Sequence, residues 1–379
     1  MKPPIVLSIN TAWNFVNFRA GLLRRLVQDG FDVVAVAPAD AHVAHLQDMG
    51  VRFVEVGIDR KGLSPLGDLT LLLRYRRILK GLSPAAYLGW TIKPNIWGSI
   101  AAATLGIPVI NNISGLGTAF MKPGPLQVLV RGLYRLALRR SSTVFFQNAV
   151  DRTLFVDAGM VRHEQTALLP GSGIDVTAFR PDNCGPPISD APVGFLMIAR
   201  LLGDKGVCEF VMAARTMRQA GCNARFRLLG AIDHDNRSAV GADELADWLA
   251  EGVIEHLPPC DDVRPAIAWA DCVVLPSYRE GMPRSLLEGA AMAKPLVASD
   301  VPGCTLIARE GENAFLCRVK DANSLAEAMG RMAALSPAER HRMGAAGRRV
   351  AEQEFDERIV IDRYVQALHR AIGRRGAGG

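Results

Sequence analysis

Two cations stand five residues apart in the second half of the chain. Arg200 and Lys205 belong to the segment A-R-L-L-G-D-K-G, which follows the apolar run 193–198 and precedes a helical pattern. Arginine can clamp a diphosphate with two hydrogen bonds and lysine adds a compact charge, while a helix start attracts anions. The spacing therefore suits diphosphate binding. The alternative is a pair of ordinary solvated loop charges.

Two acids bracket a second helix start. Glu280 and Glu288 enclose E-G-M-P-R-S-L-L-E, in which Pro283 suits the first helical position. Glu288 then lies inside the helix, on the face shared by Arg284 and Ser285. Carboxylates accept hydrogen bonds from paired hydroxyls, and free N–H groups at a helix start favour phosphate. The pattern predicts a site for sugar, diphosphate and ribose in a row. The alternative is an exposed helical Glu and a loop Glu without a role.

The elements that would position these residues follow an alternating strand and helix pattern, twice over. Continuous apolar runs are typical of parallel strands covered on both faces, and the alternation indicates doubly wound α/β architecture. Such sheets bind ligands at the carboxyl ends of their strands, where both segments lie. The expected strands are 5–9, 33–37, 53–56, 86–88, 109–112 and 144–146, then 193–198, 225–229, 253–256, 272–275, 296–298 and 314–317. The expected helices include 18–28, 65–80, 95–105, 126–139, 337–352 and 356–372.

Turn-rich segments divide the two series. Residues 170–173 and 180–192 are rich in Pro, Gly and Asp. We therefore expect one Rossmann-like lobe at 1–170 and another at 171–355. Residues 356–379 are expected to form a helix that returns to the first lobe, followed by a basic tail.

Composition supports a folded protein with two cores. The 379 residues are 49% hydrophobic and 22% charged. Too few residues precede the first strand for a signal peptide, and no apolar stretch reaches the ~18 residues of a membrane span. We expect a cytoplasmic protein whose seven cysteines, which form no CxxC pair, are free thiols.

Positive charge is concentrated in the first half. Residues 1–170 carry 19 Lys and Arg against 10 Asp and Glu, whereas the remainder carries 25 against 28. Such asymmetry indicates an anionic partner, either nucleic acid or a membrane surface. No nucleic-acid-binding signature accompanies the charge, so we expect no nucleic acid partner.

The second half resembles a known family. The stretch 280–288 is similar to the signature of the large family of retaining GT-B glycosyltransferases called family 4, and Arg200 and Lys205 match its R-x(4)-K pair. The P-G-S-G-I-D linker at 170–175 and the A-x-x-x-x-K-P-L-V-A-S-D-V-P-G run at 290–303 are similar too. The resemblance implies two Rossmann-like lobes facing a central cleft. The first would bind the acceptor and the second a nucleotide sugar.

The resemblance also assigns roles to residues. Arg200 and Lys205 would hold the donor diphosphate, Glu288 the ribose hydroxyls, and Glu280 the hydroxyls of the transferred sugar. Gly281, Met282 and Pro283 would shape the sugar pocket, and Ser285 and Leu286 would offer backbone amides to the phosphates. The family generally retains anomeric configuration by front-face displacement and needs no bound metal or other cofactor.

One motif suggests a different chemistry. The sequence Asp233-His234-Asp235 resembles the D-x-D of metal-dependent transferases of another architecture. The alternative is an exposed polar turn, and we expect no metal site.

The first half departs from the family pattern at two turns. Thr11 and Ala12 stand where many members have a glycine pair, with Asn14 as a nearby hydrogen-bonding side chain. Ser114 stands where many members have a histidine that reaches the transferred sugar. A hydroxyl can hydrogen-bond there, but it does not titrate near neutrality.

The same region resembles a bacterial subgroup. N-N-I-S-G-L-G-T at 111–118 and T-I-K-P-N-I-x-G at 91–98 are similar to enzymes that add N-acetylhexosamine-type sugars to undecaprenyl-diphosphate-linked saccharides. That resemblance implies a UDP-sugar donor and a polyprenyl-diphosphate-linked acceptor. Lys93 and Asn95 would lie on the acceptor side. The alternative for Asn95 is a helix N-cap.

Two segments combine basic and apolar residues. Residues 60–80 and 121–140 resemble basic amphipathic helices that lie on anionic lipid. The alternative is a helix packed on its own sheet with a solvated basic face. We expect peripheral contact with an anionic membrane surface, at the inner face of the bacterial cytoplasmic membrane. The basic residues are Arg60, Lys61, Arg74, Arg76, Arg77 and Lys80 in the first segment, and Lys122, Arg131, Arg135, Arg139 and Arg140 in the second.

Two rival functions share the predicted fold. A UDP-sugar 2-epimerase would bind the same nucleotide sugar but needs acid and base side chains beside it. A non-catalytic nucleotide-sugar binding protein would need no reactive groups.

Overall fold

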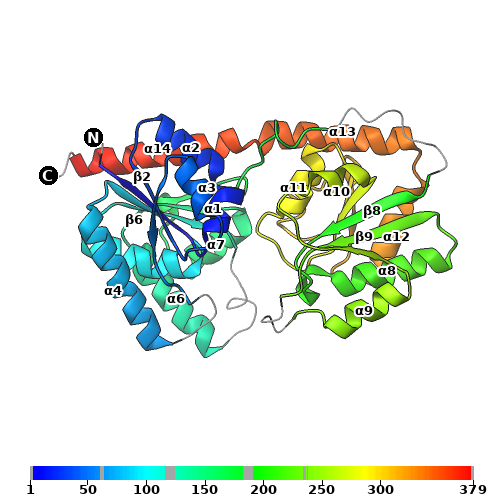
Figure 1. Ribbon diagram of the computed structural model, residues 1–379, viewed down its shortest axis with the longest axis horizontal. Coiled ribbons are helices and arrows are strands. Elements are labelled where there is room, and N and C mark those ends of the chain that lie inside the picture. Colours follow the sequence, from blue (N-terminus) through cyan, green and yellow to red (C-terminus); the bar gives the residue numbers. More distant parts are fainter. Residues whose placement is uncertain are drawn as a thin grey trace. The chain divides into compact units, whose positions relative to one another are not determined.

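The chain forms two compact α/β units (Figure 1). The computed structural model describes residues 3–59, 64–115, 124–181, 191–233, 236 and 238–376. Unit 1 comprises Met1–Ser172 and Glu357–Gly379, and unit 2 comprises Gly173–Asp356. The last helix therefore belongs to the first unit. Among the described residues, six cysteines are present and all are free thiols.

Unit 1 is built on a seven-stranded parallel sheet. Its strand order is β3-β2-β1-β4-β5-β6-β7, so the order reverses between β1 and β4. Successive residues of a strand pack on opposite faces of the sheet. In the first strand, Leu7 belongs to the core on one face and Val6 to the core on the other. The strands are β1 (Ile5–Ser8), β2 (Val33–Ala37), β3 (Arg52–Glu55), β4 (Ala86–Trp90), β5 (Val109–Ile113), β6 (Ser141–Phe146) and β7 (Thr166–Leu168).

Helices cover both faces of this sheet. Helices α1, α2, α3 and α14 share one core with it, whereas α4 and α5 form a second core and α6 and α7 a third on the other face. Tyr364 of α14 accepts hydrogen bonds from Trp90 Nε1 (2.9 Å) and Asn112 Nδ2 (2.5 Å), which fastens the last helix to β4 and β5. The helices are α1 (Ala12–Phe18), α2 (Ala20–Gln28), α3 (Val43–Asp48), α4 (Pro65–Leu82), η1 (Pro94–Gly98), α5 (Ser99–Thr104), α6 (Pro125–Leu138), α7 (Ala149–Asp157), η3 (His163–Gln165) and α14 (Glu357–Gly376).

Unit 2 is built on a six-stranded parallel sheet in the order β10-β9-β8-β11-β12-β13. This order reverses between β8 and β11, as in doubly wound nucleotide-binding sheets. The strands are β8 (Val193–Ile198), β9 (Ala224–Leu229), β10 (Glu255–Leu257), β11 (Cys272–Leu275), β12 (Leu296–Ser299) and β13 (Ala314–Cys317). The helices are η4 (Gly203–Lys205), α8 (Val207–Gln219), α9 (Ala242–Ala250), α10 (Arg264–Trp269), α11 (Arg284–Ala291), α12 (Ala322–Ala334) and α13 (Pro337–Glu354).

The structure confirms the doubly wound fold class and corrects three elements of unit 1. The helix expected over 18–28 is α2, which begins at Ala20, and a separate helix that was not expected, α1, precedes it, because the chain leaves helical geometry at the buried Arg19. The helix expected over 95–105 begins as the π-helix η1 and continues as α5. Strand β7 was not expected, because three half-buried residues are too short for a period to show.

Candidate functional site

Two loops of unit 2 meet where its strand order reverses. One follows β8 and carries Lys205, and the other follows β11 and carries Glu280. Gly206 lies between η4 and α8 with φ +77°, and a Cβ added there would lie 2.2 Å from the carbonyl oxygen of Pro276. Glycine therefore allows the two loops to touch. The backbone N–H of Tyr278 also donates to the carbonyl of Asp204 at 2.9 Å.

An ion pair joins these loops. Lys205 Nζ lies 2.5 Å from Glu280 Oε1, and the side chains are 22% and 13% exposed. Glu280 is also confined from the side of β12, since a Cβ on Gly303 would lie 2.3 Å from the Glu280 carbonyl oxygen. Three consecutive strands of the sheet thus fix the pair at their carboxyl ends.

Glu288 lies on α11, one helix turn beyond its start. It is 8% exposed, and its Oε1 accepts from Arg284 Nε at 2.8 Å. Burial raises the pKa of Glu288, and the adjacent Arg284 charge opposes that rise. The predicted face shared by Arg284 and Glu288 is therefore confirmed as an ion pair four residues apart.

The start of α11 differs from the prediction by one residue. Pro283 is the N-cap, with extended backbone, rather than the first helical residue. Arg284, Ser285 and Leu286 then occupy the first three positions, whose N–H groups have no partner within a helix. Met282 packs partly buried against the core of unit 2. Gly281 lies beside it in the same loop.

Arg200 shares the loop after β8 but turns toward β9. Its Nη1 lies 3.0 Å from Asp233 Oδ2, and its side chain is 60% exposed. Asp233 is the first acid of the D-x-D motif, whose other two residues lie outside the described part of the chain. Within the described part, no group of three or more His, Cys, Asp or Glu residues could hold a metal ion.

A tyrosine that the sequence did not single out lies beside this site. Tyr278 donates from its hydroxyl to Glu209 Oε1 at 2.6 Å, and Lys320 Nζ lies 4.9 Å from its ring centre. Burial, followed by the Glu209 carboxylate, raises the pKa of Tyr278. Its position in the loop that follows strand β11 was a usable signal, because residues at strand carboxyl ends line such sites.

Unit 1 brings Asn14 and Lys93 to its own reversal point, after β1 and β4. Thr11 is the N-cap of α1, accepting from the Asn14 N–H at 3.1 Å, and Asn14 Nδ2 donates to Asn10 Oδ1 at 2.7 Å. Lys93 Nζ lies 2.8 Å from Asp68 Oδ1 in the first turn of α4, with both side chains under a fifth exposed.

Asn95 serves a different purpose from either expectation. Its side chain is buried within η1, donates to the carbonyl of Asn112 at 2.9 Å and accepts from Asn111 Nδ2 at 2.9 Å. Asn95 therefore fastens η1 to β5 and is neither an N-cap nor an exposed acceptor contact. Ser114 follows β5 directly and is exposed.

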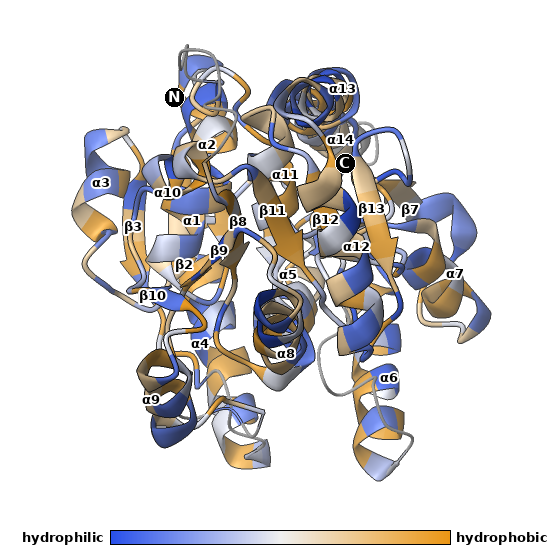
Figure 2. Ribbon diagram, turned by 90° about the vertical axis from the view of Figure 1, so that its right-hand side faces the viewer, coloured by the Kyte–Doolittle hydropathy of each residue, from blue (hydrophilic) through white to orange (hydrophobic). Residues whose placement is uncertain are grey.

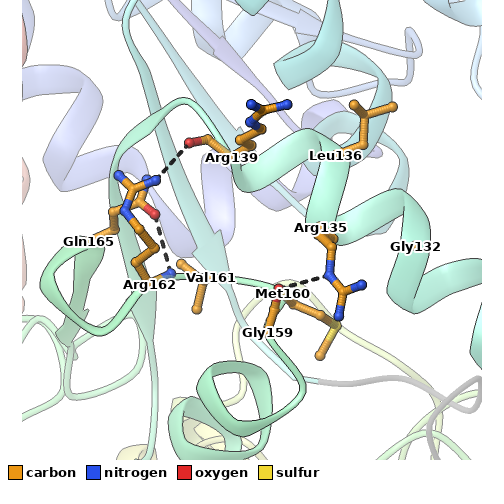
Figure 3. Close-up of a pocket in the computed structure, with 9 residues that line it drawn as sticks. All are labelled: Gly132, Arg135, Leu136, Arg139, Gly159, Met160, Val161, Arg162 and Gln165. Atoms are coloured by element: carbon orange, nitrogen blue, oxygen red, sulfur yellow. Dashed lines mark hydrogen bonds between the residues drawn. The ribbon is translucent and has the colours of Figure 1, made fainter.

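A groove of about 510 Å³ lies elsewhere on unit 1, between α6 and the turn that follows α7 (Figure 3). Arg135 reaches across it to the carbonyls of Ala158 (2.8 Å) and Gly159 (2.9 Å). None of the residues assigned to donor or acceptor lines this groove.

Comparison with known proteins identifies the fold of both units. Residues 4–148 match the family model described as Glycosyl transferase 4-like, and residues 192–334 match Glycosyl transferases group 1. Solved structures with the same fold include a glycosyltransferase from Rickettsia africae (TM-score 0.77, 15% identity, 98% of this chain and 99% of that one). Another is HepE from Anabaena with UDP and glucose (TM-score 0.79, 18% identity, 97% and 99%).

Similar proteins of known activity act on lipid-linked saccharides. One is N,N'-diacetylbacillosaminyl-diphospho-undecaprenol alpha-1,3-N-acetylgalactosaminyltransferase of Campylobacter jejuni, 27% identical over 94% of this chain and 96% of that protein. Another is UDP-Gal:alpha-D-GlcNAc-diphosphoundecaprenol alpha-1,3-galactosyltransferase of Escherichia coli, 21% identical over 81% of each. With two matching family domains on two doubly wound units, the chain belongs to the GT-B glycosyltransferases.

Proposed function

We propose that the protein transfers an N-acetylhexosamine-type sugar from a UDP-sugar to a saccharide linked to undecaprenyl diphosphate, in the assembly of a surface polysaccharide or glycan. The observation that carries this proposal is the Lys205–Glu280 ion pair at the reversal point of the second sheet, beside the buried Glu288. Cation and acids there match the order of diphosphate and hydroxyl groups in a nucleotide sugar. The names of the two similar transferases support the acceptor class.

In this proposal unit 2 binds the donor. Lys205 and Arg200 bind the diphosphate, Glu280 accepts from hydroxyls of the transferred sugar, and Glu288 accepts from the ribose hydroxyls. Gly281, Met282 and Pro283 shape the sugar pocket, and the backbone amides of Ser285 and Leu286 donate to phosphate oxygens. Because Lys205 already has Glu280 as counter-ion, the diphosphate replaces Glu280 and leaves its carboxylate available to the sugar.

Transfer proceeds on one face of the sugar ring, with retention of configuration. The bond between the anomeric carbon and the diphosphate oxygen breaks as the acceptor oxygen bonds to the same carbon. The leaving diphosphate takes the acceptor proton. Lys205 and Arg200 stabilise the negative charge that grows on the diphosphate. These two cations fill the role that a metal ion fills in other transferases, so the proposal includes no metal and no cofactor.

Unit 1 binds the acceptor through the loops after β1, β4 and β5, with Asn14, Lys93 and Ser114 as the contacting residues. Lys93 is the residue suited to the acceptor diphosphate. A lipid-linked acceptor also requires contact with a bilayer, and we propose peripheral binding to an anionic membrane at its inner face. No helix in the described part of the chain is both long and apolar enough to cross a membrane.

Radiolabelled UDP-N-acetylhexosamine tests the proposal against its rivals. With an undecaprenyl-diphosphate-linked saccharide in detergent, we expect label in the lipid fraction only when protein and acceptor are both present. A new sugar nucleotide formed without acceptor would instead identify a UDP-sugar 2-epimerase. Binding without turnover would identify a non-catalytic binding protein. Thermal stabilisation across a set of sugar nucleotides would rank the donors, and the anomeric configuration of the product would test retention.

A further inference from the structure

Trp13 is an exposed aromatic side chain at the carboxyl edge of the sheet of unit 1. It is the second residue of α1, which begins shortly after β1 ends. Its side chain is 40% exposed, and among the described residues it is the only Phe, Tyr or Trp that is exposed. Tryptophan is highly buried on average, and ligands of parallel α/β sheets bind at this edge. Trp13 is therefore a candidate ligand contact.

The position of Trp13 is fixed by several contacts. Its ring packs edge to face with Phe18, with ring centres 5.2 Å apart and an angle of 87° between the planes. Its backbone N–H donates to Asp40 Oδ2 at 2.9 Å, and its carbonyl accepts from Asn17 Nδ2 at 3.0 Å. A side chain that is already ordered loses little conformational entropy when a ligand covers it.

The carboxylate of Asp40 joins Trp13 to His42. Asp40 follows β2, and its Oδ1 accepts from the backbone N–H of His42 at 2.9 Å and lies 3.2 Å from His42 Nδ1. Burial alone would raise the pKa of Asp40, but hydrogen bonds from Trp13 and His42 outweigh it, so the pKa is lowered. An ionised carboxylate only accepts hydrogen bonds, so Nδ1 is the donor. The neutral imidazole then keeps Nε2 as an acceptor.

Trp13 and His42 come from neighbouring elements of one face. Helices α1 and α3 begin at these residues and lie side by side (Figures 1 and 2). Strands β1 and β2 are paired in the sheet, so their carboxyl ends bring the two helix starts together. The basic residues of α4 and α6 lie on the opposite face of the sheet, so they are a separate surface. Arg60, Lys61 and Lys122, which the sequence grouped with those basic residues, lie outside the described residues.

We propose that Trp13 and His42 bind a sugar ring of the acceptor saccharide, with the C–H face of the ring on the indole and a hydroxyl donating to His42 Nε2. A pyranose ring has a face of C–H groups and a rim of hydroxyls. The face of an aromatic ring is negative and attracts weakly positive C–H groups, and a polar atom beside it fixes the orientation of the ligand. This inference rests on the proposed lipid-linked saccharide acceptor. It adds the residues that recognise the sugar of that acceptor.

The charges at this edge favour a sugar beside Trp13 and the acceptor diphosphate elsewhere. Asp40 is 30% exposed and negative, so it repels a phosphate. The cation proposed for the diphosphate, Lys93, follows β4, and β1 lies between β2 and β4 in the sheet. Neighbouring strands are ~4.8 Å apart, so the ends of β2 and β4 are ~10 Å apart. One sugar ring and its diphosphate can span that distance.

Geranyl diphosphate with and without an attached sugar provides the test, with binding measured by calorimetry in the presence of UDP. The sugar is N-acetylglucosamine in one probe and N-acetylgalactosamine in another. We expect wild type to bind one of these probes about tenfold or more tightly than bare geranyl diphosphate. Trp13→Ala should reduce that gain to less than about threefold and leave the Kd of the bare probe unchanged. The proposal is overturned if the sugar adds no affinity in wild type, if Trp13→Ala keeps the full gain, or if it weakens both kinds of probe equally.

Further variants separate stacking from a general loss of surface. Trp13→Phe keeps an aromatic face and should retain the sugar-dependent gain within about threefold. His42→Ala should weaken the sugar-bearing probe about fivefold, the effect of one hydrogen bond, and no change would overturn the role of His42. His45→Ala is its control, since His45 is exposed one turn further along α3. Leu249→Ala on α9, at a side chain 41% exposed, is the control for Trp13. A loss in either control equal to that of Trp13→Ala would overturn the proposal.

Kinetics separate this inference from the proposed function. In Trp13→Ala the UDP-sugar Kd should stay within about twofold of wild type, whereas the acceptor KM in detergent should rise about tenfold with little change in kcat. Wild-type protein that transfers sugar while Trp13→Ala keeps its acceptor KM would overturn this inference alone. Wild-type protein that binds the sugar-bearing probe through Trp13 but turns over no nucleotide sugar would overturn the proposed function alone.

Discussion

Lys205 and Glu280 form a 2.5 Å ion pair although 75 residues separate them in the chain. The pair closes the gap between the loops after β8 and β11, at the reversal point of the second sheet. An ammonium that is about a fifth exposed keeps enough access to exchange its partner for a stronger anion. A diphosphate carries more charge than one carboxylate, so donor binding and release of Glu280 are expected to be one event.

Replacing Lys205 should weaken donor binding. Lys205→Met keeps the aliphatic stem and removes the charge, and hydrogen bonds to charged groups contribute about 1.5–3 kcal/mol. We therefore expect UDP-sugar Kd to rise roughly tenfold to a hundredfold, measured by calorimetry on the folded variant. Arg215→Met is the matched control, because Arg215 on α8 also pairs with an acid, Glu251, but lies away from the loop. Unchanged donor affinity in Lys205→Met would contradict the assignment.

The pH dependence of donor binding should follow Glu288. Burial raises the pKa of this carboxyl, and its ionised form accepts hydrogen bonds from two ribose hydroxyls more strongly than its neutral form. UDP-sugar affinity should therefore increase as pH rises through the raised pKa, and Glu288→Gln should be weaker and flat with pH. A UDP-sugar is the right probe, because free UDP has a phosphate that itself titrates at about pH 6.

Glu288 should also affect how the free energy of unfolding changes with pH. A carboxyl whose pKa is raised in the native state binds more protons there than in the unfolded state. Its contribution to the free energy of unfolding therefore falls as pH rises from the ordinary Glu range through the raised native pKa. At low pH, where Glu288 is neutral and its ion pair with Arg284 is lost in the wild type as well, denaturant titrations of wild type and Glu288→Gln should converge. A wild-type profile that rises across this window relative to Glu288→Gln would contradict the raised pKa.

A substitution at Gly206 tests how far donor binding depends on the close contact between the loops after β8 and β11. Gly206 and Gly221 both have φ near +75°, but an added Cβ meets the Pro276 carbonyl at Gly206 and nothing within 4 Å at Gly221. Both alanine variants should lose about 1–2 kcal/mol to backbone strain. Gly206→Ala should lose more, and it alone should weaken UDP-sugar binding, since the loop must move. Equal stability and equal donor affinity in the two variants would contradict the argument.

A chelator distinguishes a mechanism in which two cationic side chains stabilise the diphosphate from one in which a metal ion does so. Because Lys205 and Arg200 supply the positive charge in the proposed mechanism, EDTA should change the transfer rate by less than about twofold. Asp233→Asn should preserve that insensitivity, since Asp233 pairs with Arg200. If EDTA abolished transfer and Mg²⁺ or Mn²⁺ restored it, the D-x-D segment would regain its metal-binding interpretation.

The sequence predicted unit 2 more completely than unit 1, for physical reasons. Strands β8, β11 and β13 have the expected bounds, because buried parallel strands are continuous apolar runs between turn residues. The segment 280–288 predicted Glu280 in a loop and Glu288 on the helix face of Arg284, since four-residue spacing fixes neighbours on a helix, and the structure pairs these two side chains. The partner of Lys205 is a tertiary relationship between distant loops, and no local pattern specifies it.

Unit 1 shows what local patterns cannot supply. The sequence predicted Asn95 to be an acceptor-side contact or an N-cap, but its amide is fixed by Asn111 and Asn112 of β5, 16 and 17 residues away. Residues in 60–80 and 121–140 were correctly seen as basic and apolar. Whether those properties divide across a helix or along it depends on which side faces the sheet, and the structure determines that side.

Lys93 and its partner Asp68 permit the sharpest test of the acceptor side. Lys93→Met removes the cation proposed to bind the acceptor diphosphate, whereas Asp68→Asn removes only its counter-ion. We expect Lys93→Met to raise the KM for a detergent-solubilised undecaprenyl-diphosphate saccharide about tenfold or more and to leave UDP-sugar Kd unchanged. Asp68→Asn should leave acceptor KM the same or lower, because it frees the ammonium. If both variants lost the same stability and neither changed acceptor KM, the pair would serve only to join α4 to β4.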